Sequence, residues 1–482
     1  MVQEIGDGQM RIVFVFLAVA GMVLVSGGGE KGCEMELATP ESQGVSSSAI
    51  QRWIEACEQA SADGSLKGFH HGFVIVRHGK TIAEGTWAPQ NTLEKPHMLY
   101  SHSKSFTSTA IGFLVDEGRL DLDERVVSIF PEKLPAAVPE NLRQMRVRDL
   151  LTMNVGASFS DAQRKSKDGD WVKAFLHNDI ETPPGTLFKY DSCATHMLAA
   201  ITEKKSGMKL MDYLGEKLFR PLGMNSPWST TSPAGIACGG WGMNMTTRDL
   251  ARFGQFLLQE GRWGDRQLLS REWVMLATSR HTWSGPIVVQ SKIVGSGSDW
   301  AQGYGFQFWR CRHGAYRADG AGGQLTVVFP KENAVVSVSA GLGDMQKELN
   351  LIWEHLLPAF KDAPVEADET GLASLRKKCA NLALPLDDRC EEPFPGFSGQ
   401  IAERKADGWE LEISGQKLSI GDGGWARTKW KFSDSNIEPL FELYGTHEIA
   451  ACGHKDKDGS LVVVWHFLGG TRHGRYRCRI KE

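Results

Sequence analysis

The sequence predicts an α+β fold, with an antiparallel sheet flanked by helices, an all-helical subdomain and a small all-β domain at the C-terminus. The first observation is the order of the periodic apolar segments: helix, strands, many helices, strands, helix. Terminal helices that close an antiparallel sheet produce this order. The second is a change of pattern after an acidic, proline-containing segment at 361–371, beyond which short strands alternate with turns.

The first half of the chain supplies the flanking helix, a hairpin and the helical subdomain. Ser46–Ala60 has apolar residues at helical spacing, and GFVIVRHGKTIAEGTWA reads as two strands joined through His78-Gly79. A helix is expected over 98–118, ended by Glu117-Gly118. The stretch 147–280 is rich in helical patterns, which include Thr195–Lys205, Leu210–Phe219 and Thr247–Glu260.

Strands return in the second half of the predicted first domain. They are expected at Tyr304–Cys311, Ala315–Asp319, Gln324–Phe329 and Ala334–Ala340. Met345–Phe360 is an amphipathic helix that closes this domain. The predicted domains are therefore 29–362 and, after the linker, a β-rich C-terminal domain within 363–482 that includes GWELEISG, GQKLSIGDGG, SLVVVWHF and GRYRCRIKE.

The N-terminus predicts export. Ile12–Val25 is an uninterrupted apolar run followed by serine and glycines, which is too short to span a bilayer comfortably and fits the core of a signal peptide over 1–28. Acidic residues precede it, so Met10 is the better start for such a signal. The alternative is a buried N-terminal strand or helix. Export predicts a periplasmic or secreted protein of the bacterial cell envelope, without a stable membrane span after signal cleavage.

Charge and cysteine content exclude several classes. A net charge of −4 provides no basic surface, so nucleic acid is not an expected partner. The nine cysteines are scattered and contain no C-x-x-C pair, and no H-E-x-x-H helix exists, so neither a metal nor another cofactor is expected. Cys379–Cys390 and Cys452–Cys478 remain possible disulfides, and the oligomeric state is open.

The stretch MLYSHSKSFTSTAIGFLV carries a single formal charge, Lys104, in a helix that is apolar nearly all round. Such a helix lies inside a protein, so the lysine is expected to be desolvated and its pKa lowered. A lysine that is neutral near pH 7 can accept a proton from a hydroxyl. Ser101 lies three residues earlier on the same face, at the helix N-terminus. The alternative is a lysine that extends to the surface.

Ser-x-x-Lys alone is a weak signal, because the chain contains four copies, at 101–104, 206–209, 374–377 and 414–417. The other three lie in a turn, in a polar stretch and in a predicted hairpin, where the lysine is expected to be solvated. Only the copy at 101–104 lies in an apolar helix.

Three motifs in order resemble the serine β-lactamase and penicillin-binding-protein superfamily over roughly residues 38–360. HMLYSHSKSFTSTAIGFLVDEGRLDLDERVVSIFPE holds the first, and PPGTLFKYDSCATHMLAAI holds the second, Tyr190-Asp191-Ser192. In the position of the third, YRADGAGGQLTVVFPKENAVVSVSAG contains Ala321-Gly322-Gly323-Gln324. The likeness is to the class C branch with esterases and 6-aminohexanoate-oligomer hydrolases. It implies a β-lactamase/transpeptidase-like fold and an acyl-enzyme serine hydrolase.

The resemblance also implies roles for individual residues. Ser101 is the nucleophile, and Lys104 with Tyr190 shares the acid and base work, the tyrosine ionising more easily beside a cation. The oxyanion donors are the backbone N–H groups of Ser101 and Gln324. Ser192 and Ala321 contact substrate, while Gly320, Gly322 and Gly323 let it approach the edge strand, unless they only form a tight turn.

One departure from the family pattern bears on the substrate. Ala321 stands where the family has a cationic or imidazole residue that holds a substrate carboxylate, so β-lactam and D-Ala-D-Ala substrates are less expected than a small ester or amide. Arg310, Arg312 and His313 either replace that cation or are solvated strand ends. The rival interpretation is a catalytically weak or inactive penicillin-binding-like module that binds cell-wall peptides. The C-terminal domain is a lid, a wall-binding module or a dimer element.

Overall fold

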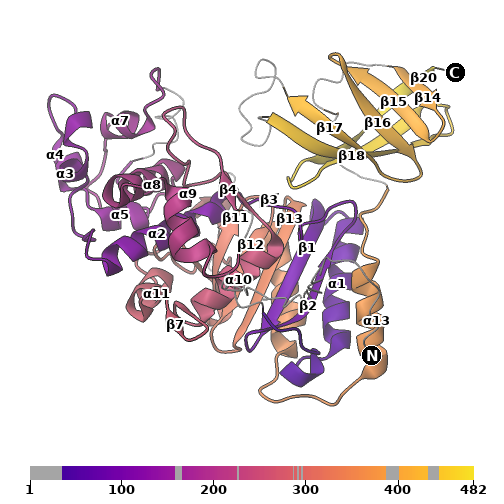
Figure 1. Ribbon diagram of the computed structural model, residues 1–482, viewed down its shortest axis with the longest axis horizontal. Helices are drawn as coiled ribbons and strands as arrows, with labels where there is room; N and C mark the ends of the chain where they lie inside the picture. Colours follow the sequence, from indigo (N-terminus) through magenta and orange to yellow (C-terminus); the bar gives the residue numbers. More distant parts are fainter. Residues whose placement is uncertain are drawn as a thin grey trace, which may run out of the picture.

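The computed structural model describes residues 35–157, 166–224, 227–285, 287–289, 292–294, 297–386, 394, 401–432 and 445–481. Figure 1 shows a body built around a central sheet, with a helical subdomain on one side and long helices on the other, and a separate β domain beside it. The predicted signal segment 1–28 lies outside the described residues. Among the residues described, no helix is long and apolar enough to cross a membrane.

The central sheet is six-stranded and antiparallel, in the order β10-β11-β12-β13-β1-β2. The predicted hairpin is confirmed as β1 and β2, with His78 (φ 49°) and Gly79 (φ 78°) in the left-handed turn that suits a two-residue loop. Both faces are covered, so the central strands are buried along their length. The strands are β1 (Gly68–Arg77), β2 (Lys80–Thr86), β10 (Trp309–Arg310), β11 (Tyr316–Gly320), β12 (Gln324–Phe329) and β13 (Ala334–Leu342).

The strand predicted over 304–311 forms only at its end, as β10. Gln307 has φ 65°, and its side chain donates to the carbonyls of Leu150 and Leu151 at 3.1 and 2.8 Å. Gln307 also accepts a hydrogen bond from Thr195 Oγ1 at 2.7 Å. These contacts hold the segment as a loop against the helical subdomain.

One face of the sheet packs on α1 (Ser47–Ala62), α12 (Met345–Leu351) and α13 (Glu369–Ala380) around the buried Trp53. Helix α13 follows the predicted linker, yet it lies against α1. Leu375 is buried there, and Lys378 Nζ is 2.5 Å from Glu58 Oε2. The first body therefore continues past the predicted boundary at 362, and the core of the β domain already includes Phe394, before β14.

The other face packs on α10 (Thr247–Leu258) and α2 (Ser103–Asp116), whose Phe253 and Phe106 rings stack with centroids 4.0 Å apart. The helical subdomain continues this core. Its helices are α3 (Val126–Ile129), α4 (Glu140–Gln144), α5 (Val147–Leu151), α7 (Trp171–Leu176), α8 (Ser192–Ser206), α9 (Leu210–Leu214) and α11 (Arg271–Thr278).

Short elements complete this body. The three-stranded sheet β3 (His97–Met98), β5 (Met243–Met245) and β4 (Trp228–Ser229) lies beside the start of α2. Two small hairpins are β6 (Arg262–Trp263) with β7 (Arg266–Gln267), and β8 (Ile287–Val289) with β9 (Lys292–Val294). The short helical turns are η1 (Glu41–Gln43), η2 (Tyr100–His102), η3 (Pro131–Lys133), η4 (Gly215–Phe219), η5 (Arg312–Gly314), η6 (Ile352–Leu356) and η7 (Leu357–Ala359).

The C-terminal domain is a seven-stranded sheet in the order β16-β15-β14-β20-β19-β18-β17, and a further pairing of β16 with β18 closes it on itself. Its core holds Trp409 and Trp465, so the predicted small all-β domain is confirmed. The strands are β14 (Ile401–Lys405), β15 (Gly408–Ile413), β16 (Gln416–Asp422), β17 (Ala426–Phe432), β18 (Gly445–Lys455), β19 (Leu461–Phe467) and β20 (His473–Lys481).

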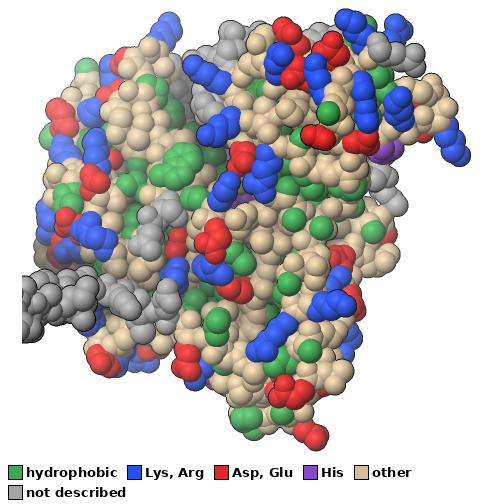
Figure 2. Space-filling model, turned by 45° about the vertical axis from the view of Figure 1, so that its right-hand side comes forward, with side chains coloured by type: hydrophobic (Ala, Val, Ile, Leu, Met, Phe, Trp, Pro, Cys, Tyr) green, Lys and Arg blue, Asp and Glu red, His purple; other side chains and the backbone are tan. Residues whose placement is uncertain are grey.

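The sequence also made predictions about surface charge and about disulfides. On the face shown in Figure 2, basic and acidic side chains are interspersed. Cys452 and Cys478 are free thiols, so they do not form the disulfide left open by the sequence. Cys379 is also a free thiol, and its possible partner Cys390 lies outside the described residues.

Candidate active site

Ser101 lies in the short turn η2, directly before α2 and beside β5. Tyr100, just before it, has φ 48°, a left-handed conformation that costs a bulky residue on the order of 1–3 kcal/mol. Strand β5 holds the turn on both sides, because Leu99 N donates to Met243 O at 2.9 Å and Met243 N donates to Ser103 Oγ at 3.1 Å. The expected helix thus begins with a strained turn that presents Ser101.

Lys104 lies inside the protein, on the same side of α2 as Ser101. Its side chain is 1% exposed, which contradicts the alternative of a lysine that reaches the surface. The Nζ atom is 3.1 Å from Ser101 Oγ, 2.9 Å from Ser192 Oγ and 2.6 Å from Gly240 O. The spacing of the first motif therefore places the amine within hydrogen-bond distance of the hydroxyl.

Burial also changes the charge of Lys104. It lowers the pKa of the amine to about 7, against the opposing attraction of the Asp191 and Asp319 carboxylates. A neutral amine has two N–H groups and one lone pair. The Gly240 carbonyl can only accept, so it takes one hydrogen, and the Ser192 hydroxyl can take the other. The lone pair is then directed at the Ser101 hydroxyl, which is the arrangement of a general base and its nucleophile.

Tyr190 packs between Lys104 and an aromatic wall. Lys104 Nζ lies 4.8 Å from the centroid of its ring, and the ring stacks on Trp309 at 5.5 Å. Burial raises the pKa of the Tyr190 hydroxyl far above its usual value, although a hydrogen bond with Ser101 and the charge of Arg317 oppose this. The expectation of an easily ionised phenol is therefore wrong, because desolvation of the phenolate outweighs the nearby cations. Tyr190 is a neutral phenol at neutral pH.

The start of α8 explains the rest of the second motif. Asp191 caps the helix by accepting from Cys193 N at 2.6 Å, so its charge serves the helix rather than the substrate. Ser192 instead faces Lys104. Gly240 approaches so closely that a Cβ there would lie 2.7 Å from Ser192 O, which only glycine avoids. Gly240 was not among the expected site residues, although it lies in a glycine-rich stretch.

The end of β11 lies against the serine turn. Strand β10 pairs with β11 at Tyr316 and Arg317, so the last residues of β11 lie beyond this pairing, and β11 contacts the turn η2. A Cβ on Gly320 would lie 2.0 Å from Leu99 O and 3.1 Å from His102 N. Gly320 is therefore the point of contact, and the exposed Ala321 follows it in the turn.

The remaining residues of the expected third motif also have close neighbours. A Cβ on Gly322 would meet Thr471 Cγ2 at 2.6 Å, and one on Gly323 would lie 2.8 Å from Glu348 Oε2. Gln324 pairs with Gly320 in the hairpin, and its side chain donates to Ala340 O at 2.6 Å. The structure thus brings Gly320 to the serine turn, with Gln324 paired beside it at the start of β12, which also contacts that turn. The oxyanion role of the Gln324 backbone N–H stays a prediction.

A buried ion pair near the site was missed by the sequence analysis. Arg317 is fully buried, donates from Nε to Asp319 Oδ2 at 2.8 Å and lies 4.4 Å from the Trp300 ring centroid. The expected cations lie elsewhere, since Arg310 donates to Thr278 O at 2.9 Å and Arg312 is 2.8 Å from Asp299. Residues two apart in a strand lie on the same face of the sheet. The spacing of the oppositely charged Arg317 and Asp319 in an apolar strand is therefore the sequence pattern that could have predicted this ion pair.

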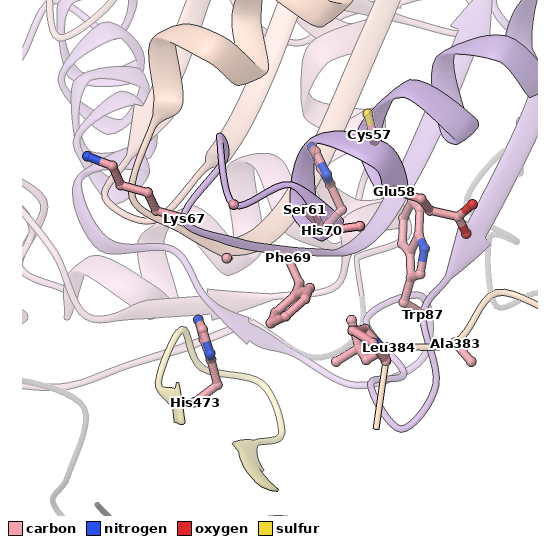
Figure 3. Close-up of a pocket in the computed structure, with 14 residues that line it drawn as sticks. Cys57, Glu58, Ser61, Lys67, Phe69, His70, Trp87, Ala383, Leu384 and His473 are labelled. Atoms are coloured by element: carbon pink, nitrogen blue, oxygen red, sulfur yellow. The ribbon is translucent and has the colours of Figure 1, made fainter. Parts of the chain in front are cut away.

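The cavity drawn in Figure 3 is not part of the site around Ser101. It measures about 670 Å³ and opens between α1, the start of β1, the segment 383–385 and His473 of the C-terminal domain. Phe69, Trp87 and Leu384 line it, and Ser101 does not. Across the described part of the chain, no group of three or more His, Cys, Asp or Glu side chains is placed to hold a metal ion.

The fold and the site together define a class. The protein has a six-stranded antiparallel sheet with a helical subdomain on one face, and Ser101, Lys104 and Tyr190 lie where the two meet. This arrangement is that of the β-lactamase/transpeptidase-like proteins. The model of the Beta-lactamase family matches residues 56–353, more than half of the chain. The chain belongs to this family.

Individual relatives are more distant. A 6-aminohexanoate-dimer hydrolase from Paenarthrobacter ureafaciens is 28% identical over 221 residues, which is 42% of this chain and 55% of that protein. The chain thus matches only about half the length of that curated relative.

Two solved structures share the fold. A putative 6-aminohexanoate-dimer hydrolase from Bacillus anthracis superposes with a TM-score of 0.54, 20% identity and coverage of 68% of this chain and 88% of that one. An octameric penicillin-binding protein homologue from Pyrococcus abyssi gives a TM-score of 0.51 at 18% identity, covering 90% of this chain and 96% of that one. The second likeness extends into the C-terminal domain.

Gly320→Ala is expected to lower kcat at least tenfold while the protein stays folded. The new Cβ can be accommodated only by moving the serine turn. A misplacement of reacting groups by about 1 Å can lower the rate a hundredfold. The measurement is steady-state ester hydrolysis beside a melting curve. Gly297→Ala is the matched control, since a Cβ there meets nothing within 4 Å. Equal kcat values for wild type and Gly320→Ala would contradict the close contact.

Proposed function

We propose that this protein is a serine hydrolase that forms an acyl-enzyme at Ser101 on a small ester or amide. The observation that carries the proposal is Lys104. Its amine is buried, has a pKa lowered to about 7 and lies 3.1 Å from Ser101 Oγ. Burying an amine in this way is costly, and the contact supports its use as a base for the serine hydroxyl.

The proposed reaction begins with a proton transfer. As Ser101 Oγ bonds to the substrate carbonyl carbon, its proton moves to Lys104 Nζ and the carbonyl electrons become an oxyanion. The backbone N–H of Ser101, at a helix start, is one donor for the oxyanion, and a backbone N–H of the turn after Gly320 is the other. When the oxyanion returns to a carbonyl, the bond to the leaving group breaks and the leaving group takes the proton from Lys104, beside the neutral Tyr190 hydroxyl. Water then attacks the acyl carbon and gives its proton to Lys104, and Ser101 Oγ leaves as the free acid forms and takes that proton back.

The charges near the site support a neutral substrate. The cation beside the β11 edge, Arg317, is buried and offset by Asp319 at 2.8 Å, so it does not offer a free charge to a substrate carboxylate. Ala321 adds none. These features favour esters and small amides over β-lactams or D-Ala-D-Ala peptides, and the name of the Paenarthrobacter relative, a 6-aminohexanoate-dimer hydrolase, supports including an amide.

A substrate panel tests the proposal. Wild-type protein is expected to hydrolyse p-nitrophenyl acetate with a kcat/KM at least tenfold above that for nitrocefin, because nitrocefin presents a carboxylate that the site does not pair. The 6-aminohexanoate dimer and D-amino-acid amides complete the panel. A higher value for nitrocefin would contradict the preference for neutral substrates.

The rival function is a module that binds cell-wall peptides with little or no turnover. Ala321 favours it, whereas the contacts of Lys104 disfavour it. A fluorophosphonate probe separates the two, because it labels an activated serine without needing the natural substrate. Absence of labelling in the wild type would end the enzyme proposal.

We also propose that the protein is exported. The apolar run at 12–25 supports this. The N-terminal residue of protein recovered from the periplasm or medium tests it, and recovery of an uncleaved chain from the cytoplasm would contradict it.

A further inference from the structure

The loop between β19 and β20, residues 468–472, contacts the segment that carries Ser101. It is tied to β3, the strand just before the serine turn, because Met98 N donates to Gly469 O at 2.8 Å. Gln90 fixes it further, donating to Phe467 O at 2.8 Å and accepting from Gly469 N at 3.0 Å. The loop is thus held against the first body by backbone contacts on both sides of residue 468.

Within this loop, the side chain of Thr471 touches both halves of the site. Its hydroxyl is 2.7 Å from the Tyr100 hydroxyl, and Tyr100 is the strained residue that precedes Ser101. Its methyl group lies where Gly322 approaches, since a Cβ on Gly322 would be 2.6 Å away. One side chain from the second domain therefore joins the serine turn to the hairpin at the end of β11.

We infer that Thr471 is a positioning residue, which acts on Ser101 through Tyr100 and makes the C-terminal domain part of the active site. The inference rests on the proposed function. Tyr100 holds a left-handed φ that its own side chain disfavours, so the turn needs external contacts to keep it. Strand β5 supplies backbone contacts, and Thr471 supplies the contact to the Tyr100 hydroxyl. Without that contact the turn can relax and Ser101 Oγ shifts relative to Lys104 Nζ.

This role differs from domain docking. Other contacts join the two domains away from the serine turn, among them the pair of Lys95 and Glu448 at 2.7 Å and the Gln90 bonds. If Thr471 only helped the domains to dock, removing Lys95 would have the same effect as removing its hydroxyl. A positioning role predicts a loss of kcat that only the Thr471–Tyr100 pair shows.

The test uses the full-length protein and p-nitrophenyl acetate. Thr471→Val and Tyr100→Phe each remove one hydroxyl and are each expected to lower kcat roughly three- to tenfold, the range that one hydrogen bond supports, with KM changed less than twofold. The double variant is expected to lose no more than either single variant, because both remove the same bond. Thr471→Ser, which keeps the hydroxyl, is expected to restore kcat to within twofold of the wild type. Lys95→Gln is the matched control, with kcat unchanged.

Each outcome decides the inference. An inactive wild type would refute the proposed function, and that result is separate from any result on Thr471. With an active wild type, unchanged kcat in Thr471→Val and Tyr100→Phe would overturn the inference. So would an equal loss in Lys95→Gln, or multiplied losses in the double variant. Melting curves check that each variant folds, and Tyr100→Phe provides the test if Thr471→Val does not.

Discussion

Ser101→Ala is expected to reduce ester hydrolysis by roughly 10⁴-fold or more and to abolish fluorophosphonate labelling, because the reaction then has no oxygen to form the acyl bond. The fold should tolerate the change. Ser101 is only partly buried, and the bonds of Leu99 N and Met243 N that hold its turn do not use its side chain. Intact-mass measurement of the probe adduct and initial rates provide the two readouts.

Ser108→Ala is the matched control for Ser101→Ala. Ser108 lies on the same helix face and is buried, but within the described part of the chain its hydroxyl has no hydrogen-bond partner. It should label and turn over as the wild type does. Residual labelling of Ser101→Ala at the wild-type rate would show that another residue is the nucleophile.

The activity of the wild type is expected to rise with pH through about 7 and to level off above it. Lys104 can take the Ser101 proton only when its amine is neutral, and burial lowers the pKa of that amine to about 7. Lys104→Met is expected to lose at least about 10³-fold in kcat and this limb of the profile. Rate profiles of kcat/KM from pH 5 to 9 test both statements.

The exposed lysine of another Ser-x-x-Lys copy provides the control for Lys104. Lys377→Met, on the outer side of α13, should keep the wild-type rate and profile. A wild-type profile that is flat between pH 5 and 9 would contradict a neutralised Lys104. So would a profile that falls across this range.

The same pKa shift makes a prediction about stability. In the unfolded chain Lys104 titrates near its ordinary value of 10.5, and in the folded protein near 7. Between these values the unfolded state binds one more proton, so the free energy of unfolding rises with pH by about 1.4 kcal/mol per unit relative to Lys104→Met. Urea unfolding of both proteins from pH 7 to 9.5 measures the difference. Below about pH 7 the two curves should run parallel.

Much of the fold follows from local patterns. The hairpin of β1 and β2, the helices α1 and α10 and the strands of the C-terminal domain are encoded by periodicity within windows of a few residues. The same holds for Ser101 and Lys104. Three residues of spacing place the hydroxyl and the amine on the same side of the chain.

Other features are set by residues far apart in the chain. The packing of α8 and the glycine-rich stretch against α2 decides that Ser192 and Gly240 take the two hydrogens of Lys104. It also decides that burial raises the pKa of the Tyr190 hydroxyl. A sequence pattern records which residues are apolar, but not which surfaces meet or how much water they exclude.

The sequence by itself determined an α+β protein with a serine and a lysine on one buried helix face, because helix periodicity and hydrophobic burial act between near neighbours. Only the tertiary structure decided that α13 belongs to the first body, that Gly320 meets the serine turn, and that Thr471 reaches Tyr100 from the second domain. These contacts join segments up to several hundred residues apart, and their geometry arises from the packing of whole layers.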